Sequence, residues 1–121
     1  MNAVSISPLS TDPQSIFKQR YGNYIGGRWV EPQGGRYLDN LTPITGRAFT
    51  SVPRSDAADI DAALDAAHAA KGAWGRTSAA ERSNVLLRIA DRIEENLELL
   101  AYAETWDNGK PIRETLNADV P

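Results

Sequence analysis

"RSDAADIDAALDAAHAAKGAW", residues 54–74, is the stretch where the hydrophobic pattern of the chain changes to that of a helix. Apolar side chains recur 3, 4, 7 and 14 positions after the first, which is the spacing of a single helical stripe. These residues are Ile60, Ala63, Leu64, Ala67 and Trp74. Ser55 or Asp56 can cap this helix, which is expected to end around residues 72–75. Because alanine buries little apolar area, the helix needs a close neighbour.

Two short hairpins are predicted before this helix, within residues 21–53. "YGNYIGGRWVEP" places aromatic and aliphatic pairs on both sides of Gly26 and Gly27, which can adopt the positive φ of a two-residue turn. Further on, "RYLDNL" and "RAFTSV" flank "TPITG", where proline and glycine favour a second turn. The pattern predicts a small antiparallel meander.

Further helices are predicted after residue 77. Ser78 and Glu81 in "SAAE" have the spacing of a capping box, in which each side chain bonds the other residue's backbone N–H. One apolar face then follows, made of Val85, Leu86, Ile89, Ile93, Leu97 and Leu100. Asn96, a good N-cap residue, is expected to divide this region into helices near 78–95 and 97–107. The tail "RETLNADVP" begins another helical turn.

Composition excludes several classes of partner for this chain of 121 residues. A net charge of −3 leaves no basic patch for phosphates, so we expect no nucleic-acid partner. No apolar run approaches the roughly 20 residues of a membrane span, and the start lacks a signal peptide, so a cytoplasmic protein without a membrane partner is expected. Residues 1–20, rich in Ser, Pro, Gln and Thr, are predicted to form a flexible arm that folds only where something holds it.

Composition also limits the chemistry. The absence of cysteine excludes a disulfide, a cysteine zinc site and a thiol nucleophile, and the single histidine, His68, excludes a histidine pair. A surface or packing role is the simpler interpretation of His68. The glycine pairs at 26–27 and 34–35 lack phosphate-loop spacing and indicate turns. A run of acidic residues is interpreted as a solvated helix face without function: Glu94, Glu95 and Glu98.

"ETWDNGKP", which begins at Glu104, is open to two interpretations. Glu104 and Asp107 are three residues apart, so their side chains could meet on one helix face and share a proton or a hard cation. Alternatively, the segment is a helix stop. Gly109 would adopt the left-handed conformation, Lys110 would reach the last free carbonyls, and Pro111 would prevent continuation. Spacing and composition favour the helix stop.

The ordered set of these phrases resembles the amino-terminal part of NAD(P)-dependent aldehyde dehydrogenases. The phrases are "YIGGRWV", "LTPITGRAF", the alanine-rich helix ending in "AW", "ERSNVLLRIADRIEEN" and "ETWDNGKP". "DNGKP" is the sharpest of them, and the resemblance runs over residues 21–121. The chain looks most like the bacterial branch that oxidises acetaldehyde and similar short aliphatic aldehydes.

Strands followed by helices would indicate an α+β fold in a complete domain. The resemblance instead implies an α/β fold: an amino-terminal fragment, truncated at residue 121, of a Rossmann-type cofactor domain. Antiparallel hairpins at 21–53 and helices at 56–107 would belong to this domain, and the parallel sheet would follow later in the chain. The apolar helix faces would then lack their partners, so we expect the chain alone to be marginally stable, self-associating or molten.

The resemblance also implies a reaction and an assembly. In such enzymes, which are tetramers or dimers, a cysteine thiolate attacks the aldehyde, hydride passes to NAD or NADP, and a glutamate activates the water that releases the acid. All of this machinery is expected beyond Pro121. We therefore assign no catalytic and no cofactor-binding residue to the chain and expect it to be inactive alone. The alternative is a non-catalytic helical module that docks on a partner or on full-length subunits.

One family feature can be carried over to this segment. In several relatives a structural monovalent cation is held by the aspartate of "DNGKP" and by backbone carbonyls before the "PITG" turn. The corresponding ligands here are Asp107 and the carbonyls of Asn40 and Leu41. Because all of these are oxygen donors, the resemblance implies a site for K⁺ or Na⁺.

Overall fold

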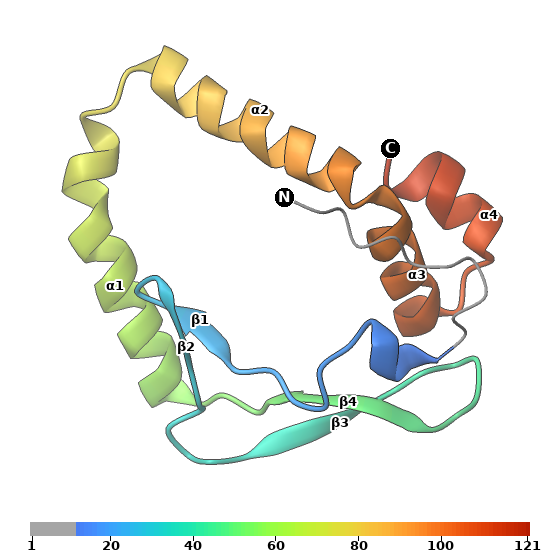
Figure 1. Ribbon diagram of the computed structural model, residues 1–121. Coiled ribbons are helices and arrows are strands. Elements are labelled where there is room, and N and C mark those ends of the chain that lie inside the picture. The colour runs from blue at the N-terminus through green and yellow to red at the C-terminus, as the bar shows by residue number, and fades with distance from the viewer. Residues whose placement is uncertain (1–11) are drawn as a thin grey trace.

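The computed structural model describes residues 12–121 and contains four strands and several helices (Figure 1). Residues 1–11 of the predicted arm lie outside the described residues. In chain order the elements are η1 (Pro13–Ser15), β1 (Asn23–Ile25), β2 (Arg28–Val30), β3 (Tyr37–Leu41), β4 (Ala48–Pro53), α1 (Ala57–Gly75), α2 (Ala79–Glu95), α3 (Leu97–Asn108), α4 (Ile112–Glu114) and the π-helical segment η2 (Thr115–Asp119).

Both predicted hairpins are present. β1 pairs with β2 across Gly26 and Gly27, whose φ angles are 61° and 79°. β3 pairs with β4, and the register shifts between Asn40 and Leu41. The prediction of a meander is wrong, because the hairpins form two separate two-stranded sheets. The connection explains this: the N–H of Gly35 donates to the carbonyl of Pro32 at 2.8 Å and closes a turn between β2 and β3.

Part of the predicted arm is held against β4. The rings of Phe17 and Phe49 lie 4.6 Å apart in an edge-to-face arrangement. The hydroxyl of Thr50 donates to the carbonyl of Lys18 at 2.7 Å, and the backbone N–H of Ser51 donates to the carbonyl of Gln19 at 3.0 Å. These contacts connect residues 12–20 to the sheet, whereas the flexibility predicted for residues 1–20 stays a prediction.

The start of α1 is fixed by Asp56, which the sequence offered as one of two caps. Asp56 and Asp59 form a capping box, while the hydroxyl of Ser55 bonds the side chain of Asn23. Asp59 is only 3% exposed, and its Oδ1 accepts the backbone N–H of Gln33 at 2.8 Å. One carboxylate therefore caps the helix and attaches it to the chain that follows β2.

The capping box predicted at the start of α2 is confirmed, with Ser78 and Glu81 bonding each other's backbone N–H. The hydrogen bond from the Ser78 backbone N–H lowers the pKa of the exposed Glu81 carboxyl, and the bond from the Ser78 hydroxyl lowers it further. The break between α2 and α3 occurs at Asn96, as predicted. Its side chain donates to the carbonyl of Arg92 at 2.7 Å, so it satisfies the end of α2 and does not cap α3.

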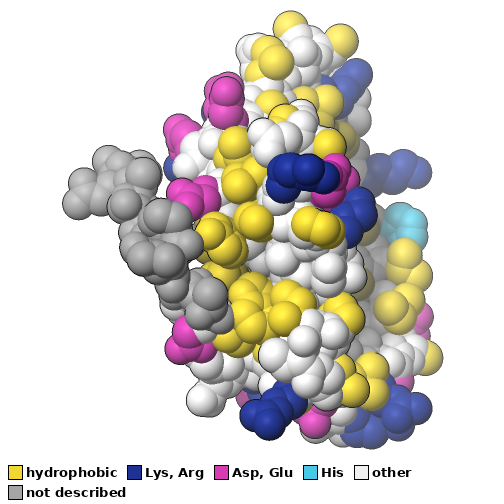
Figure 2. All heavy atoms as spheres, turned by 90° about the vertical axis from the view of Figure 1, so that its right-hand side faces the viewer, with side chains coloured by type: hydrophobic (Ala, Val, Ile, Leu, Met, Phe, Trp, Pro, Cys, Tyr) yellow, Lys and Arg dark blue, Asp and Glu magenta, His cyan; other side chains and the backbone are white. Residues whose placement is uncertain are grey.

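The helices and strands follow one another around a ring in Figure 1, with α2 on the opposite side from the β3–β4 sheet. Few side chains in residues 12–121 are buried, and the buried apolar ones are Phe49 and Ala101. Many large apolar side chains are exposed instead, including Leu86 at 67% and Ile93 at 40%. Figure 2 shows such side chains gathered on the side of the molecule where α3 and α4 lie. The apolar face predicted along α2 and the start of α3 is exposed at Leu86, Ile89, Ile93 and Leu100, whereas Val85 and Leu97 are half-buried.

Candidate functional site

Asn40 and Asp107, two of the residues predicted to hold a cation, are brought together from distant parts of the chain, through the side chain of Asn40 and not through its predicted ligand, the backbone carbonyl. The side-chain amide of Asn40 on β3 donates to Oδ1 of Asp107 in the last turn of α3 at 2.6 Å. Among residues 12–121, Oδ2 of Asp107 has no hydrogen-bond partner. Leu41 lies where the β3–β4 register shifts, so this carboxylate is adjacent to an irregular point of the strand ladder.

A second contact holds the same helix end against the hairpin loop. Gly109 has a φ of 79°, and a Cβ built on it would lie 2.8 Å from Cγ of Pro43. That distance is shorter than real Cβ contacts, so the backbone at Gly109 approaches the loop as closely as a glycine allows. The end of α3 is thus attached to the β3–β4 hairpin on both sides of Asn108.

The two carboxylates of "ETWDNGKP" accept hydrogen bonds from different partners. Asp107 accepts from Asn40, whereas Glu104 accepts from the side-chain amide of Asn108 at 2.5 Å. Each carboxylate is therefore stabilised by a separate neutral donor. The geometry gives no support to an acid–base pair at these positions.

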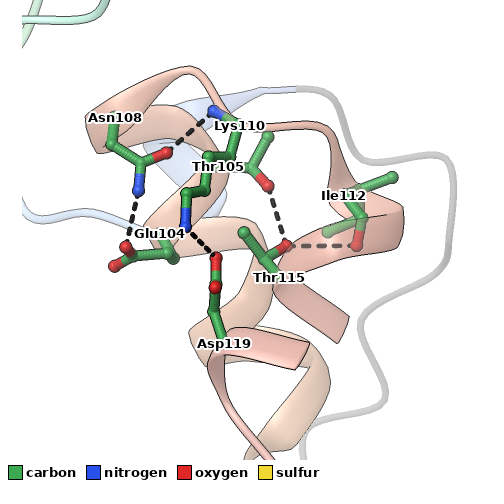
Figure 3. Close-up of polar contacts among 7 residues, drawn as sticks. All are labelled: Glu104, Thr105, Asn108, Lys110, Ile112, Thr115 and Asp119. Carbon is green, nitrogen blue, oxygen red and sulfur yellow. Dashed lines mark hydrogen bonds and ion pairs between the residues drawn. The ribbon is translucent and has the colours of Figure 1, made fainter. Parts of the chain in front are cut away.

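The predicted helix stop is confirmed for the backbone of Gly109, whereas the predicted partner of the Lys110 side chain is wrong. Gly109 adopts the left-handed conformation, and its N–H donates to the carbonyl of Thr105 at 2.9 Å. Lys110 was expected to reach the last carbonyls of α3. Instead, its ammonium bonds Asp119 of η2 at 2.8 Å, a hydrogen bond that raises the pKa of the Lys110 amine (Figure 3). The tail folds back within reach of Lys110, so the carboxylate replaces weaker carbonyl acceptors.

A pair of hydroxyls joins α3 to the tail. Oγ1 of Thr105 and Oγ1 of Thr115 are 3.0 Å apart, and the Thr115 hydroxyl also donates to the carbonyl of Ile112 at 3.1 Å (Figure 3). Thr115 is fully buried. Thr115 and Asp119 were not predicted as partners of α3, because the sequence of the tail indicates a helical turn but not where that turn packs.

The remaining candidates behave as the simpler interpretations predict. His68 is exposed on α1, and the acidic run of Glu94, Glu95 and Glu98 is exposed at the end of α2 and the start of α3. Within residues 12–121, no three His, Cys, Asp or Glu side chains are grouped so that they could hold a metal ion. In the same range no helix is both long enough and apolar enough to span a membrane.

The ligands predicted for a cation are the Asp107 carboxylate and two backbone carbonyls. A site made of one carboxylate and backbone carbonyls supplies oxygen donors with a single negative charge, which suits a weakly charged hard cation. The Asn40 N–H occupies Oδ1 of Asp107, and Oδ2 is the oxygen left for an ion.

Comparisons with known proteins agree in naming one family. The family model described as "Aldehyde dehydrogenase family" matches residues 29–121. The chain is 62% identical to acetaldehyde dehydrogenase 2 of Cupriavidus necator over 121 residues, which is all of this chain and 24% of that protein. It is 68% identical to the acetaldehyde dehydrogenase of Pseudomonas aeruginosa over 105 residues, 87% of this chain and 21% of that protein.

Solved structures give the same result. PnpE in complex with nicotinamide adenine dinucleotide matches with a TM-score of 0.83 and 42% identity, over 86% of this chain and 21% of that one. HpcC from Thermus thermophilus matches with a TM-score of 0.84 and 32% identity, over 89% and 21%. The predicted α/β fold class is thereby confirmed.

The chain spans about a quarter or less of the length of the curated relatives that it matches. The family model nevertheless covers most of the chain, from Trp29 to Pro121, and the solved structures that resemble it in sequence also share its fold. The chain belongs to the aldehyde dehydrogenase family.

Proposed function

We propose that the chain is the amino-terminal part of the cofactor domain in an NAD(P)-dependent aldehyde dehydrogenase. The whole protein would oxidise acetaldehyde or a similar short aldehyde to the carboxylic acid. The observation that carries this proposal is the match of the family model to residues 29–121. Relatives named acetaldehyde dehydrogenase support the substrate class, and PnpE in complex with nicotinamide adenine dinucleotide supports NAD as the cofactor.

The role proposed for this segment is structural. The family reaction needs a cysteine nucleophile, and the sequence of 121 residues contains no cysteine. The apolar face of α2 is exposed, with Leu86 at 67% and Ile89 at 49%. Burying such side chains against the rest of a subunit would stabilise both parts, by roughly 1.5 to 3 kcal/mol for each fully buried one. The chain alone would be inactive, and the whole protein would be a cytoplasmic dimer or tetramer.

We also propose that Asp107, with the carbonyls of Asn40 and Leu41, binds K⁺ or Na⁺. Asp107 is fixed beside β3 by the 2.6 Å hydrogen bond from Asn40, and its second oxygen is available. Crystals soaked in rubidium or thallium should show an anomalous peak at Asp107, and Asp107→Asn should remove it. Glu104→Gln is the matched control on the same helix, and a soaked crystal without a peak would disprove the site.

A chimeric enzyme tests the main proposal. The aligned segment of the Cupriavidus necator relative is replaced by this chain of 121 residues, and aldehyde-dependent NAD reduction is measured. Retained turnover with acetaldehyde is the expected result, and Leu86→Asp in the chimera should reduce the yield of folded enzyme. A chimera that assembles like its parent and yet does not turn over would contradict the proposal.

Experiments on the isolated chain distinguish the enzyme segment from the alternative, a non-catalytic docking module. Neither hypothesis predicts NAD reduction by the purified chain, so detectable turnover would contradict both. Tight binding to intact subunits of the relative, without replacing their own amino-terminal segment, would favour the docking module. The exposed α2 face would then be the surface that binds a partner.

A further inference from the structure

We propose that Asn108 is a latent deamidation site that becomes reactive only when the last turn of α3 opens. Asn108 and Gly109 form the single Asn-Gly pair in the sequence. Glycine places no side chain near the backbone nitrogen that attacks, so this pair reacts faster than other asparagine pairs in an unfolded chain. Asn108 is also exposed, which gives water access to the product.

The reaction is balanced without any cofactor. The Gly109 nitrogen, after losing its proton, attacks Cγ of Asn108, and an N–C bond forms as the bond from Cγ to Nδ2 breaks. The side-chain amide takes up the proton and leaves as ammonia, which produces a succinimide. Water then opens the ring at either carbonyl, giving aspartate or isoaspartate at position 108.

The folded structure protects the attacking nitrogen. The Gly109 N–H donates to the carbonyl of Thr105 at 2.9 Å, which holds the proton that must be lost. The Asn108 side chain is held at both ends, with Oδ1 accepting from the N–H of Lys110 at 2.8 Å and Nδ2 donating to Glu104 (Figure 3). The bond from Lys110 also polarises Cγ, so the missing element in the folded chain is a free nucleophile.

Opening this turn requires the helix end to leave the hairpin. Asp107 is bonded to Asn40, and Gly109 lies against Pro43, so the residues on both sides of Asn108 are attached to the β3–β4 hairpin. A carboxylate formed at 108 would lie beside Glu104, where the structure now has an amide donor. It would also lie at the negative end of the α3 dipole. The product therefore disfavours closure, and the covalent change shifts the end of α3 toward the open state.

The test follows deamidation by peptide mass mapping in the complete protein, folded and in denaturant, together with hydrogen exchange of the Gly109 amide. Denaturation should accelerate conversion at 108 by the same factor by which it accelerates exchange at Gly109, because one opening exposes both. Asn96, also at a helix end and followed by Leu97, is the internal control. In denaturant it should convert far more slowly than Asn108.

Two variants sharpen the test in the folded protein. Glu104→Ala removes the acceptor of Nδ2 and should raise the rate at 108 about two- to tenfold, the response to losing one hydrogen bond. Glu98→Ala, on the exposed first turn of the same helix, should leave the rate unchanged. Equal deamidation rates at Asn108 in the folded and denatured protein would show that the folded structure does not protect this residue. Conversion of Asn96 as fast as Asn108 in denaturant would overturn the site itself.

Discussion

Asn40 on β3 donates a 2.6 Å hydrogen bond to Asp107 on α3, across 67 positions of sequence. This contact and the approach of Gly109 to Pro43 join the hairpin to the end of the third helix. The buried apolar side chains in residues 12–121 are Phe49 and Ala101, so little apolar burial supports the packing of α3 against the hairpin. The polar contact therefore matters more for this architecture than it would in a chain with a large core.

A double-mutant cycle should measure that contact. Asn40→Ala and Asp107→Ala should each lower the free energy of unfolding by about 1 kcal/mol, the net value of a hydrogen bond. The double variant should lose less than the sum, because the second substitution removes a bond already broken. Denaturant unfolding of the four proteins provides the values, and strict additivity would show that the two side chains do not interact in solution.

Local chemistry explains which parts of this fold were predictable from sequence. Ser78 with Glu81 and the glycine stop at Gly109 act within a few residues, so their partners could be identified from spacing alone. The hairpin turn at Gly26–Gly27 is of the same kind. The number of sheets was not predictable in this way, because it depends on where the turn after Pro32 sends the chain.

In the candidate site, too, local contacts could be predicted from the sequence and contacts that depend on tertiary packing could not. The resemblance to a family placed Asp107 near Asn40, which no local pattern could have done. Lys110 was assigned to the nearest carbonyls, but a carboxylate at Asp119, brought close by the folding of the tail, is a stronger acceptor. Likewise, Asp59 could be read as a helix residue, while its bond to the backbone of Gln33 depends on tertiary packing.

The start of α2 should depend on pH through Glu81. Hydrogen bonds from Ser78 lower the pKa of this carboxyl in the folded state, so its contribution to stability is present above the unfolded pKa and is lost as the pH falls through the folded pKa. Helicity followed by circular dichroism on acidification should therefore decline in the unmodified protein. Glu81→Gln, which keeps the capping geometry without the charge, should flatten that part of the profile. An unchanged profile would show that the box does not depend on charge.

The exposed face of α2 should control association of the isolated chain and have little effect on its folding. Leu86→Lys changes a side chain that is 67% exposed, so the free energy of unfolding should stay within about 0.5 kcal/mol while self-association falls. Ala101→Leu is the contrasting variant, because Ala101 is fully buried and added methylenes there should cost about 1 to 3 kcal/mol. Sedimentation velocity and denaturant unfolding separate the effects, and a Leu86→Lys chain that associates as before would exclude this face.

Two glycines with the same φ angle can distinguish backbone strain from steric contact at the end of α3. Gly109 and Gly27 both have a φ of 79°, so alanine at either position pays the same left-handed penalty, about 1 to 2 kcal/mol. Gly27 has open space where a Cβ would be, whereas at Gly109 the Cβ would meet Cγ of Pro43 at 2.8 Å. Gly109→Ala should therefore destabilise the chain more than Gly27→Ala, by an amount that reports the contact alone. Pro43→Ala should remove most of that difference by deleting the ring, and equal losses in the presence of Pro43 would mean that the helix end does not rest on the hairpin loop.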